Sequence, residues 1–89
     1  MPKYRVMLSN KALKFLTSLD EKNGKRVIAD LERLANYPFW DRSLDIAVFE
    51  GERRQYRLRT GKLRTIFKID QDAETILVQK IGYRENVYE

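Results

Sequence analysis

The sequence predicts one α+β domain in which two helices pack on one side of a mainly antiparallel sheet. Three observations support this fold class. Two amphipathic segments, at residues 11–19 and 20–37, follow a short apolar strand. Residues 53–60 and 63–69 alternate polar and apolar side chains, as strands do. The pair Gly61-Lys62 divides the longest alternating stretch and is typical of a hairpin turn.

The expected order of elements is a strand, two helices and then three to four strands. A chain of 89 residues forms one small domain, which we expect to span residues 1–89. Its hydrophobic content of 43% is sufficient for a core and argues against disorder. The chain contains no internal repeat and no stretch with the composition of a linker.

The first two elements are a strand at residues 3–8 and a helix directly after it. Tyr4, Val6 and Leu8 occupy every second position and are expected on one side of the strand. Ser9 or Asn10 can cap the helix by accepting a hydrogen bond from a free backbone N–H. The helical spacing of apolar residues predicts one buried face, made of Ala12, Leu13, Leu16 and Leu19.

The second helix is expected to begin after Asp20, its N-cap, and to end near Tyr37, because Pro38 cannot continue it. The pair Asn23-Gly24 leaves open a break in the first turn. Apolar residues again recur at helical spacing and predict a buried face, made of Val27, Ile28, Leu31, Leu34 and Ala35.

Residues 38–45 are expected to connect the helices to the sheet, with Phe39 and Trp40 closing the end of the core. The sheet then starts near Ile46 and bends at Gly51. After the central hairpin, residues 70–74 turn the chain into a last strand at residues 75–81.

The central hairpin joins residues 53–60 to residues 63–69. With Gly61 and Lys62 as the turn, the expected pairs are Thr60–Leu63, Arg59–Arg64, Leu58–Thr65, Arg57–Ile66 and Tyr56–Phe67. Side chains alternate between the two faces of a strand, so Arg57, Arg59 and Arg64 share one face. Like charges on one face destabilise a hairpin, which indicates either an anionic ligand or pairing with surface carboxylates such as Glu50 or Glu52.

The charge of the chain also favours a polyanionic partner, because the net charge is +5 and the pI is about 9.6. Residues 53–68 contain seven arginines and lysines and no acid, so the positive charge is concentrated in one patch. The chain has no cysteine and no histidine, which excludes disulfides and thiolate sites, and we expect no metal site. No apolar run is long enough for a membrane span, so a soluble, cytoplasmic protein without membrane contact is expected.

Two motifs in the second half of the chain carry a family resemblance. The first is Y-R-L-R-x-G-x-L-R-x-I-F at residues 56–67, and the second is I-G-Y-R-x-x-V-Y at residues 81–88. In order and spacing they resemble the RelE branch of the RelE/ParE toxin superfamily. Together with the helices before them, the resemblance covers nearly the whole chain.

The resemblance implies a RelE-like fold and the toxin of a type II toxin–antitoxin system. Its implied activity is that of an endoribonuclease that cleaves mRNA in the ribosomal A site by 2′-hydroxyl attack and so inhibits translation. Neither a metal nor an organic cofactor is implied. The implied partners are the ribosome with its mRNA and a RelB-like antitoxin, through which alone the toxin would contact operator DNA.

The resemblance also assigns roles to residues. Arg57 matches a basic residue near the scissile phosphate, Arg64 the arginine that stabilises the transition state, and Arg84 the residue described as the general acid. Tyr88 matches a terminal tyrosine that stacks on the cleaved nucleotide. The remaining residues expected to bind RNA are Arg54, Gln55, Arg59, Lys62 and Lys80.

Some positions depart from the family pattern and leave alternatives open. Gln55 stands where some members have a lysine, and Tyr83 where many have a histidine, so the general base is not identified. Glu85 is either that base or a salt-bridge partner of Arg84. Arginine stays protonated in proteins, so electrostatic stabilisation by Arg84 is physically safer than proton donation.

Two further contacts with RNA are alternatives to simpler structural roles. Trp40 can stack on a base instead of packing. The outer face of the second helix is expected to be solvated charge, with RNA binding as the alternative, and comprises Lys22, Lys25, Arg26 and Arg33.

The alternative functions are a ParE-like inhibitor of DNA gyrase, which shares the fold without being an enzyme, and an inactive RNA-binding relative. The complete set of Arg57, Arg64, Arg84 and Tyr88 favours the RelE function.

Overall fold

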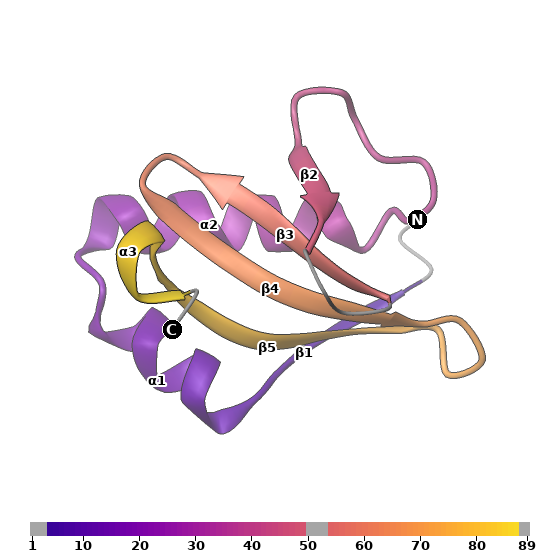
Figure 1. Cartoon of the computed structure of the whole chain (residues 1–89), viewed down its shortest axis with the longest axis horizontal. Helices are drawn as coiled ribbons and strands as arrows, with labels where there is room; N and C mark the ends of the chain where they lie inside the picture. Colours follow the sequence, from indigo (N-terminus) through magenta and orange to yellow (C-terminus); the bar gives the residue numbers. More distant parts are fainter. Residues whose placement is uncertain (1–3, 50–53, 88–89) are drawn as a thin grey trace.

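The computed structural model describes residues 4–49 and 54–87 (Figure 1). Five strands form one sheet in the order β1-β5-β4-β3-β2, in which β1 and β5 are parallel and the other pairs are antiparallel. The elements in chain order are β1 (Arg5–Leu8), α1 (Asn10–Ser18), α2 (Glu21–Leu34), β2 (Asp45–Val48), β3 (Gln55–Thr60), β4 (Leu63–Asp70), β5 (Thr75–Tyr83) and α3 (Arg84–Val87). The predicted α+β fold is confirmed, and α3 is an element that the sequence did not predict.

Both long helices begin at the predicted caps. The hydroxyl of Ser9 accepts a hydrogen bond from the backbone N–H of Ala12 at 3.0 Å. The carboxylate of Asp20 accepts one from the backbone N–H of Asn23 at 3.2 Å and one from its side chain at 2.8 Å. Helix α2 continues through Asn23 and Gly24, so the break left open there does not occur. It ends at Leu34, earlier than predicted, and residues 35–38 form turns.

The main core lies between the two long helices and one face of the sheet. Ala12 of α1 and Val27 of α2 are fully buried against residues such as Leu58 and Phe67. The prediction that Leu13 and Ile28 are buried in the core is wrong, because Leu13 is 49% exposed and Ile28 is 45% exposed. Each follows a fully buried residue by one position, which turns its side chain about 100° around the helix and away from the sheet.

The connection between α2 and β2 closes the core with one aromatic residue instead of two. The indole N–H of Trp40 donates to the carbonyl oxygen of Leu34 at 2.9 Å, and its ring packs edge-on against Phe67 with a centroid distance of 6.0 Å. This packing supports the structural role of Trp40. Phe39 is 86% exposed, so its predicted core position is wrong: the turn that brings Trp40 inward directs its neighbour outward.

The β3–β4 hairpin has the predicted register, from Thr60–Leu63 at the turn to Tyr56–Phe67. Gly61 has a φ of 59°, the left-handed conformation that glycine adopts without steric cost. The predicted bend at Gly51 and the carboxylates of Glu50 and Glu52 lie outside the described residues.

Strand β5 contains a bulge that determines which side chains reach the far face of the sheet. Ile66 pairs with Lys80 but Phe67 pairs with Val78, so Gln79 is an extra residue. The side chains of β5 that point into the core therefore shift by one position along the strand. They are at even-numbered residues up to Val78 and at the odd-numbered Ile81 after the bulge. As a result Gly82 lies opposite Arg64, on the face away from the core. The strand ends at Tyr83, two residues later than predicted.

In the described part of the chain, no helix has the length and apolar character needed to cross a membrane.

Candidate functional site

Four arginines from three elements surround one shallow hollow on the sheet face opposite the core. Arg57 and Arg59 come from β3, Arg64 from β4 and Arg84 from the start of α3. Glu85 is the fifth residue that lines it, and we call this site the arginine hollow. Because neighbouring guanidinium groups repel one another, such a gathering favours binding of an anion.

Arg64 is the most firmly held of these arginines. It is 6% exposed, and its Nη1 donates to the carbonyl oxygens of Gly61 at 2.8 Å and Leu63 at 2.9 Å. Among the described residues no buried side-chain nitrogen or oxygen lacks a partner. No hydrogen bond joins the other nitrogens of Arg64 to residues 4–49 or 54–87, and Arg64 lines the hollow. The guanidinium is thus fixed by the turn and presents free donors outward.

Arg57 and Arg59 share one carboxylate, that of Asp45 in β2. Nη2 of Arg57 lies 3.5 Å from Oδ1, and Nε of Arg59 lies 3.3 Å from Oδ2. Asp45 is the cross-strand partner of Arg59 in the sheet register. Asp45 was not among the site residues predicted from the sequence. Pairing residues 45–48 with residues 56–59 would have revealed it, because Asp45 then falls on the face of the arginines.

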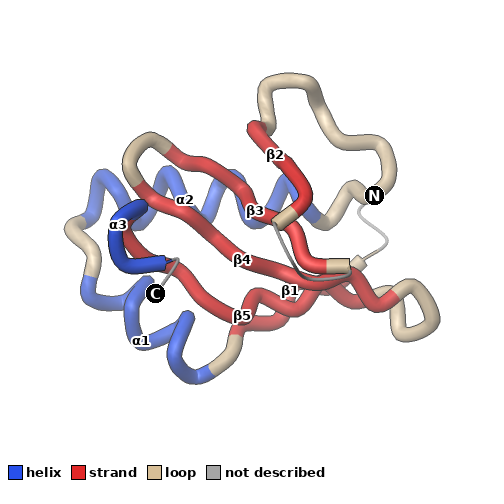
Figure 2. Tube along the Cα trace, in the orientation of Figure 1, coloured by secondary structure: helices blue, strands red, loops and turns tan. Residues whose placement is uncertain are grey.

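Helix α3 carries Arg84 to the hollow and lies over the end of the hairpin (Figure 2). The backbone N–H of Arg84 donates to the carbonyl oxygen of Lys62 at 3.1 Å. Val87 is buried over Gly82, where an added Cβ would lie 3.2 Å from its Cγ2. The guanidinium of Arg84 forms no hydrogen bond or ion pair with residues 4–49 or 54–87. This cation, which is unpaired within the described residues, therefore sits on a backbone that is anchored at both ends of α3.

The absence of a side chain at Gly82 leads to our first prediction. Replacement of Gly82 by alanine should destabilise the fold by about 1–3 kcal/mol, because the new methyl group would crowd Val87 and displace α3. The measurement is the free energy of unfolding in urea. Gly24→Ala is the matched control: Gly24 lies inside α2 with open space around it, so alanine there should stabilise by about 0.5–1 kcal/mol. Equal stability of the Gly82→Ala and wild-type proteins would contradict this packing.

Apart from Arg59, the residues expected to bind RNA do not line the arginine hollow, although the strand registers place Gln55 and Lys80 on the same face of the sheet. Gln55 pairs with Gln79 through their side chains, and Lys80 Nζ donates to the carbonyl oxygen of Asn86 at 3.3 Å, at the end of α3. Lys62 is exposed in the hairpin turn. Arg54 lies at the far end of β3, has a φ of 63° and lines a different hollow, so it is not brought to the other arginines.

Tyr88 lies outside the described residues. Its placement relative to the arginine hollow therefore stays a prediction.

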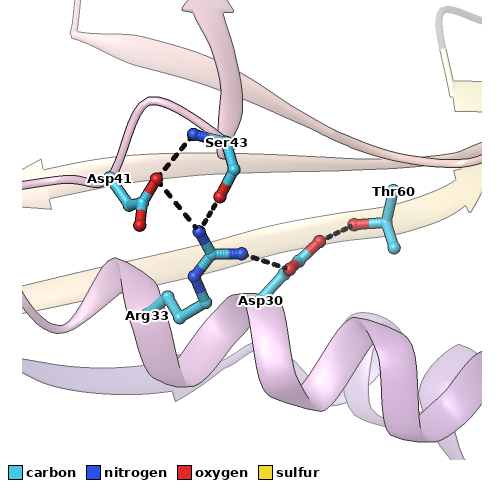
Figure 3. Close-up of polar contacts among 5 residues, drawn as sticks. All are labelled: Asp30, Arg33, Asp41, Ser43 and Thr60. Carbon is cyan, nitrogen blue, oxygen red and sulfur yellow. Dashed lines mark hydrogen bonds and ion pairs between the residues drawn. The ribbon is translucent and has the colours of Figure 1, made fainter.

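A polar network on the other side of β3 ties the site to α2 (Figure 3). Arg33 donates to Asp30 at 3.4 Å and to the hydroxyl of Ser43, and lies 3.7 Å from Asp41. The hydroxyl of Thr60 donates to the other carboxylate oxygen of Asp30 at 2.8 Å. Arg33 was expected to be solvated charge, but the structure uses it to hold the segment that leads into β2.

Asp41 belongs to the same network, and its surroundings favour the ionised carboxylate. Hydrogen bonds from the backbone N–H and then the side chain of Ser43, and to a lesser degree the charge of Arg33, lower the pKa of Asp41 below its usual value. The segment before Asp45 is therefore held by a carboxylate that stays charged at neutral pH.

Comparison with known proteins places this chain among toxins of toxin–antitoxin systems. The family model described as the ParE toxin of the type II toxin–antitoxin system parDE matches residues 6–88. No curated protein matches the sequence.

Similar solved structures share the fold over almost the whole chain. A chain of the archaeal RelE–RelB complex from Pyrococcus horikoshii OT3 is 25% identical, with a TM-score of 0.80, covering 96% of this chain and 99% of that one. A chain of the Escherichia coli RelBE complex is 18% identical with a TM-score of 0.74, covering 93% and 99%. A chain of the E. coli DinJ–YafQ complex is 9% identical with a TM-score of 0.79, covering 98% and 99%.

Proposed function

Because the chain belongs to the ParE toxin family of type II toxin–antitoxin systems, within the RelE/ParE superfamily, we propose that it inhibits translation as a ribosome-dependent endoribonuclease. The observation that carries this proposal is the arginine hollow, where β3, β4 and α3 bring four guanidinium groups together. The planar donor fork of arginine matches the oxygens of a phosphate group. A phosphodiester of RNA is therefore the substrate that fits the chemistry of the site.

In the proposed reaction the 2′-hydroxyl of a nucleotide attacks the adjacent phosphorus. The O2′–P bond forms and the P–O5′ bond breaks, which yields a 2′,3′-cyclic phosphate and a 5′-hydroxyl. The proton lost by the 2′-hydroxyl is balanced by the proton that the leaving 5′-oxygen gains. Negative charge on the phosphorane peaks between these two events, and stabilising it is the task of the arginines.

Each arginine has a role that its environment supports. Arg64, held by the carbonyl oxygens of Gly61 and Leu63, is preorganised to donate to the phosphorane. Arg84 contributes a solvent-facing positive charge from the other side of the hollow. Arg57 binds the scissile phosphate near the attacking hydroxyl. We further propose that Tyr88 stacks on the cleaved nucleotide.

The composition of the site explains the proposed requirement for the ribosome. The chain has no histidine, and guanidinium groups remain protonated, so the arginines act electrostatically and not as acids or bases. Such a site gains most from a substrate that is already held in line for attack. In this proposal the ribosomal A site supplies that geometry, and the toxin acts in the cytoplasm.

We propose a RelB-like antitoxin as the partner that neutralises the toxin. The similar structures from P. horikoshii and E. coli are complexes of RelE with RelB. A partner that binds only the folded toxin also stabilises it. Contact with operator DNA would occur through the antitoxin.

Inhibition of DNA gyrase is the second candidate function, and the family match favours it, since the matching family is that of the ParE toxins. A gyrase inhibitor acts by binding and does not need four arginines around one hollow. The arginine set therefore makes RNA cleavage the first choice. An RNA-binding relative without activity is the remaining alternative.

The test compares both activities in purified systems. We expect the protein to stop cell-free translation and to produce new mRNA 5′ ends, mapped by primer extension, only when ribosomes are present. Supercoiling by DNA gyrase should be unaffected at the same toxin concentration. Equal cutting of naked mRNA, or inhibited gyrase with intact mRNA, would overturn the proposal.

A further inference from the structure

The carboxylate of Asp45 contacts two of the arginines, Arg57 and Arg59. Its two oxygens lie 3.5 Å from Nη2 of Arg57 and 3.3 Å from Nε of Arg59. In the free protein, two of the four arginines of the hollow therefore already share one internal carboxylate. A phosphate that uses Nη2 of Arg57 or Nε of Arg59 has to displace this carboxylate.

The position of Asp45 is fixed by the fold. The residue is paired with Arg59 in the β2–β3 register. The segment just before it is held to α2, where Arg33 contacts both Ser43 and Asp41 (Figure 3). The backbone N–H of Ser43 also donates to Asp41 at 2.8 Å, so Arg33, Asp41 and Ser43 all contact one another. The segment that places Asp45 beside the arginines is thus anchored to α2.

The pairing is weak enough to be exchanged. The side chain of Asp45 is 48% exposed, and both distances exceed those of good charge-assisted hydrogen bonds. Exposed ion pairs of this kind contribute little to stability. A phosphodiester that receives two parallel hydrogen bonds from a guanidinium is a stronger partner. Asp45 therefore weakens the binding of a phosphate without preventing it.

We propose that Asp45 is a built-in competitor of RNA, which keeps Arg57 and Arg59 paired in the free toxin and lowers its affinity for RNA outside the ribosome. The inference rests on the proposed function for the nature of the ligand. This competition limits the binding of a strongly basic protein to RNA outside the ribosome, which is present in large excess. RNA presented in the ribosome binds because additional contacts offset the displacement of Asp45.

The experiment measures affinity for a short single-stranded 2′-O-methyl oligoribonucleotide, which cannot be cleaved, by fluorescence anisotropy without ribosomes. Asp45→Asn should bind about three- to tenfold more tightly at low salt, because the weak pairing is lost. The plot of log affinity against log salt should steepen by about 0.7 for each arginine newly available to a phosphate. Asp45→Glu, which restores the negative charge, should bind like the wild type.

Asp72→Asn is the matched control. It changes the net charge by the same amount, but Asp72 is exposed in the turn between β4 and β5, at the end of the sheet opposite the Gly61 turn. Its affinity should rise by much less than that of Asp45→Asn. Circular dichroism establishes that each variant is folded.

Three outcomes would overturn the proposal. Equal gains in affinity for Asp45→Asn and Asp72→Asn would show that the change in net charge alone causes the tighter binding. Unchanged affinity of Asp45→Asn would show that the carboxylate does not compete. Weaker binding would show that Asp45 positions the arginines for RNA instead. Because the probe is measured without ribosomes, none of these results depends on whether the wild-type protein cleaves mRNA.

Discussion

Replacement of Arg64 by alanine should lower the single-turnover rate of mRNA cleavage on the ribosome by about 10²–10³-fold, the loss typical of removing one preorganised donor to a developing oxyanion. Arg64 is the arginine whose guanidinium is fixed by the hairpin turn and is nearly enclosed. Its free donors therefore need no reorganisation when charge develops on the phosphorane. Affinity for the ribosome should change little, since the interaction reaches full strength only in the transition state.

Arg64→Lys should remain nearly as slow as Arg64→Ala. The guanidinium bonds two carbonyl oxygens through Nη1 and still keeps other nitrogens for the hollow, whereas an ammonium group has one nitrogen for both tasks. Arg5→Ala is the control, because it removes the same charge from an exposed position on β1. If affinity falls as much as rate in Arg64→Ala, this residue is an ordinary phosphate-binding arginine.

Local signals in the sequence were sufficient to predict the centre of the fold. Alternation on both sides of Gly61-Lys62 determines the register of the hairpin, and that register places Arg57, Arg59 and Arg64 on one face. Ser9 and Asp20 were recognisable as caps because their side chains act on backbone groups only three residues away. These features depend on neighbours in sequence, which is why they could be predicted.

Features that depend on distant packing could not be predicted in this way. The bulge at Gln79 changes the phase of β5, and only then does Gly82 lie opposite Arg64 with room for Val87. Helix α3 has four residues, too few for a periodic pattern, and is held by the contact with Lys62 across the hairpin. Asp45 reaches the arginines only because β2 pairs with β3.

Arg64 and Arg84 are therefore held in the arginine hollow in different ways, which has a consequence for Arg84. At Arg64 the side chain itself is anchored, by the carbonyl oxygens of the turn. At Arg84 the backbone is anchored, by the bond from its N–H to Lys62 at 3.1 Å, and the side chain is exposed. A cation at position 84 is thus held at the arginine hollow by α3, and no hydrogen bond or ion pair within residues 4–49 and 54–87 requires a guanidinium there.

Arg84→Ala should consequently lower the single-turnover cleavage rate by about 10²-fold, because an electrostatic contact to the transition state is lost. Arg84→Lys should retain the rate to within about tenfold, since a lysine there keeps the point charge that the proposed role needs. The same lysine substitution thus has opposite outcomes at positions 64 and 84. The comparison is made with ribosome-bound mRNA, rapid quenching and excess toxin, with affinity measured in parallel. An Arg84→Lys protein as slow as Arg84→Ala would show that the hollow uses the planar fork of Arg84, and that charge alone does not explain its contribution.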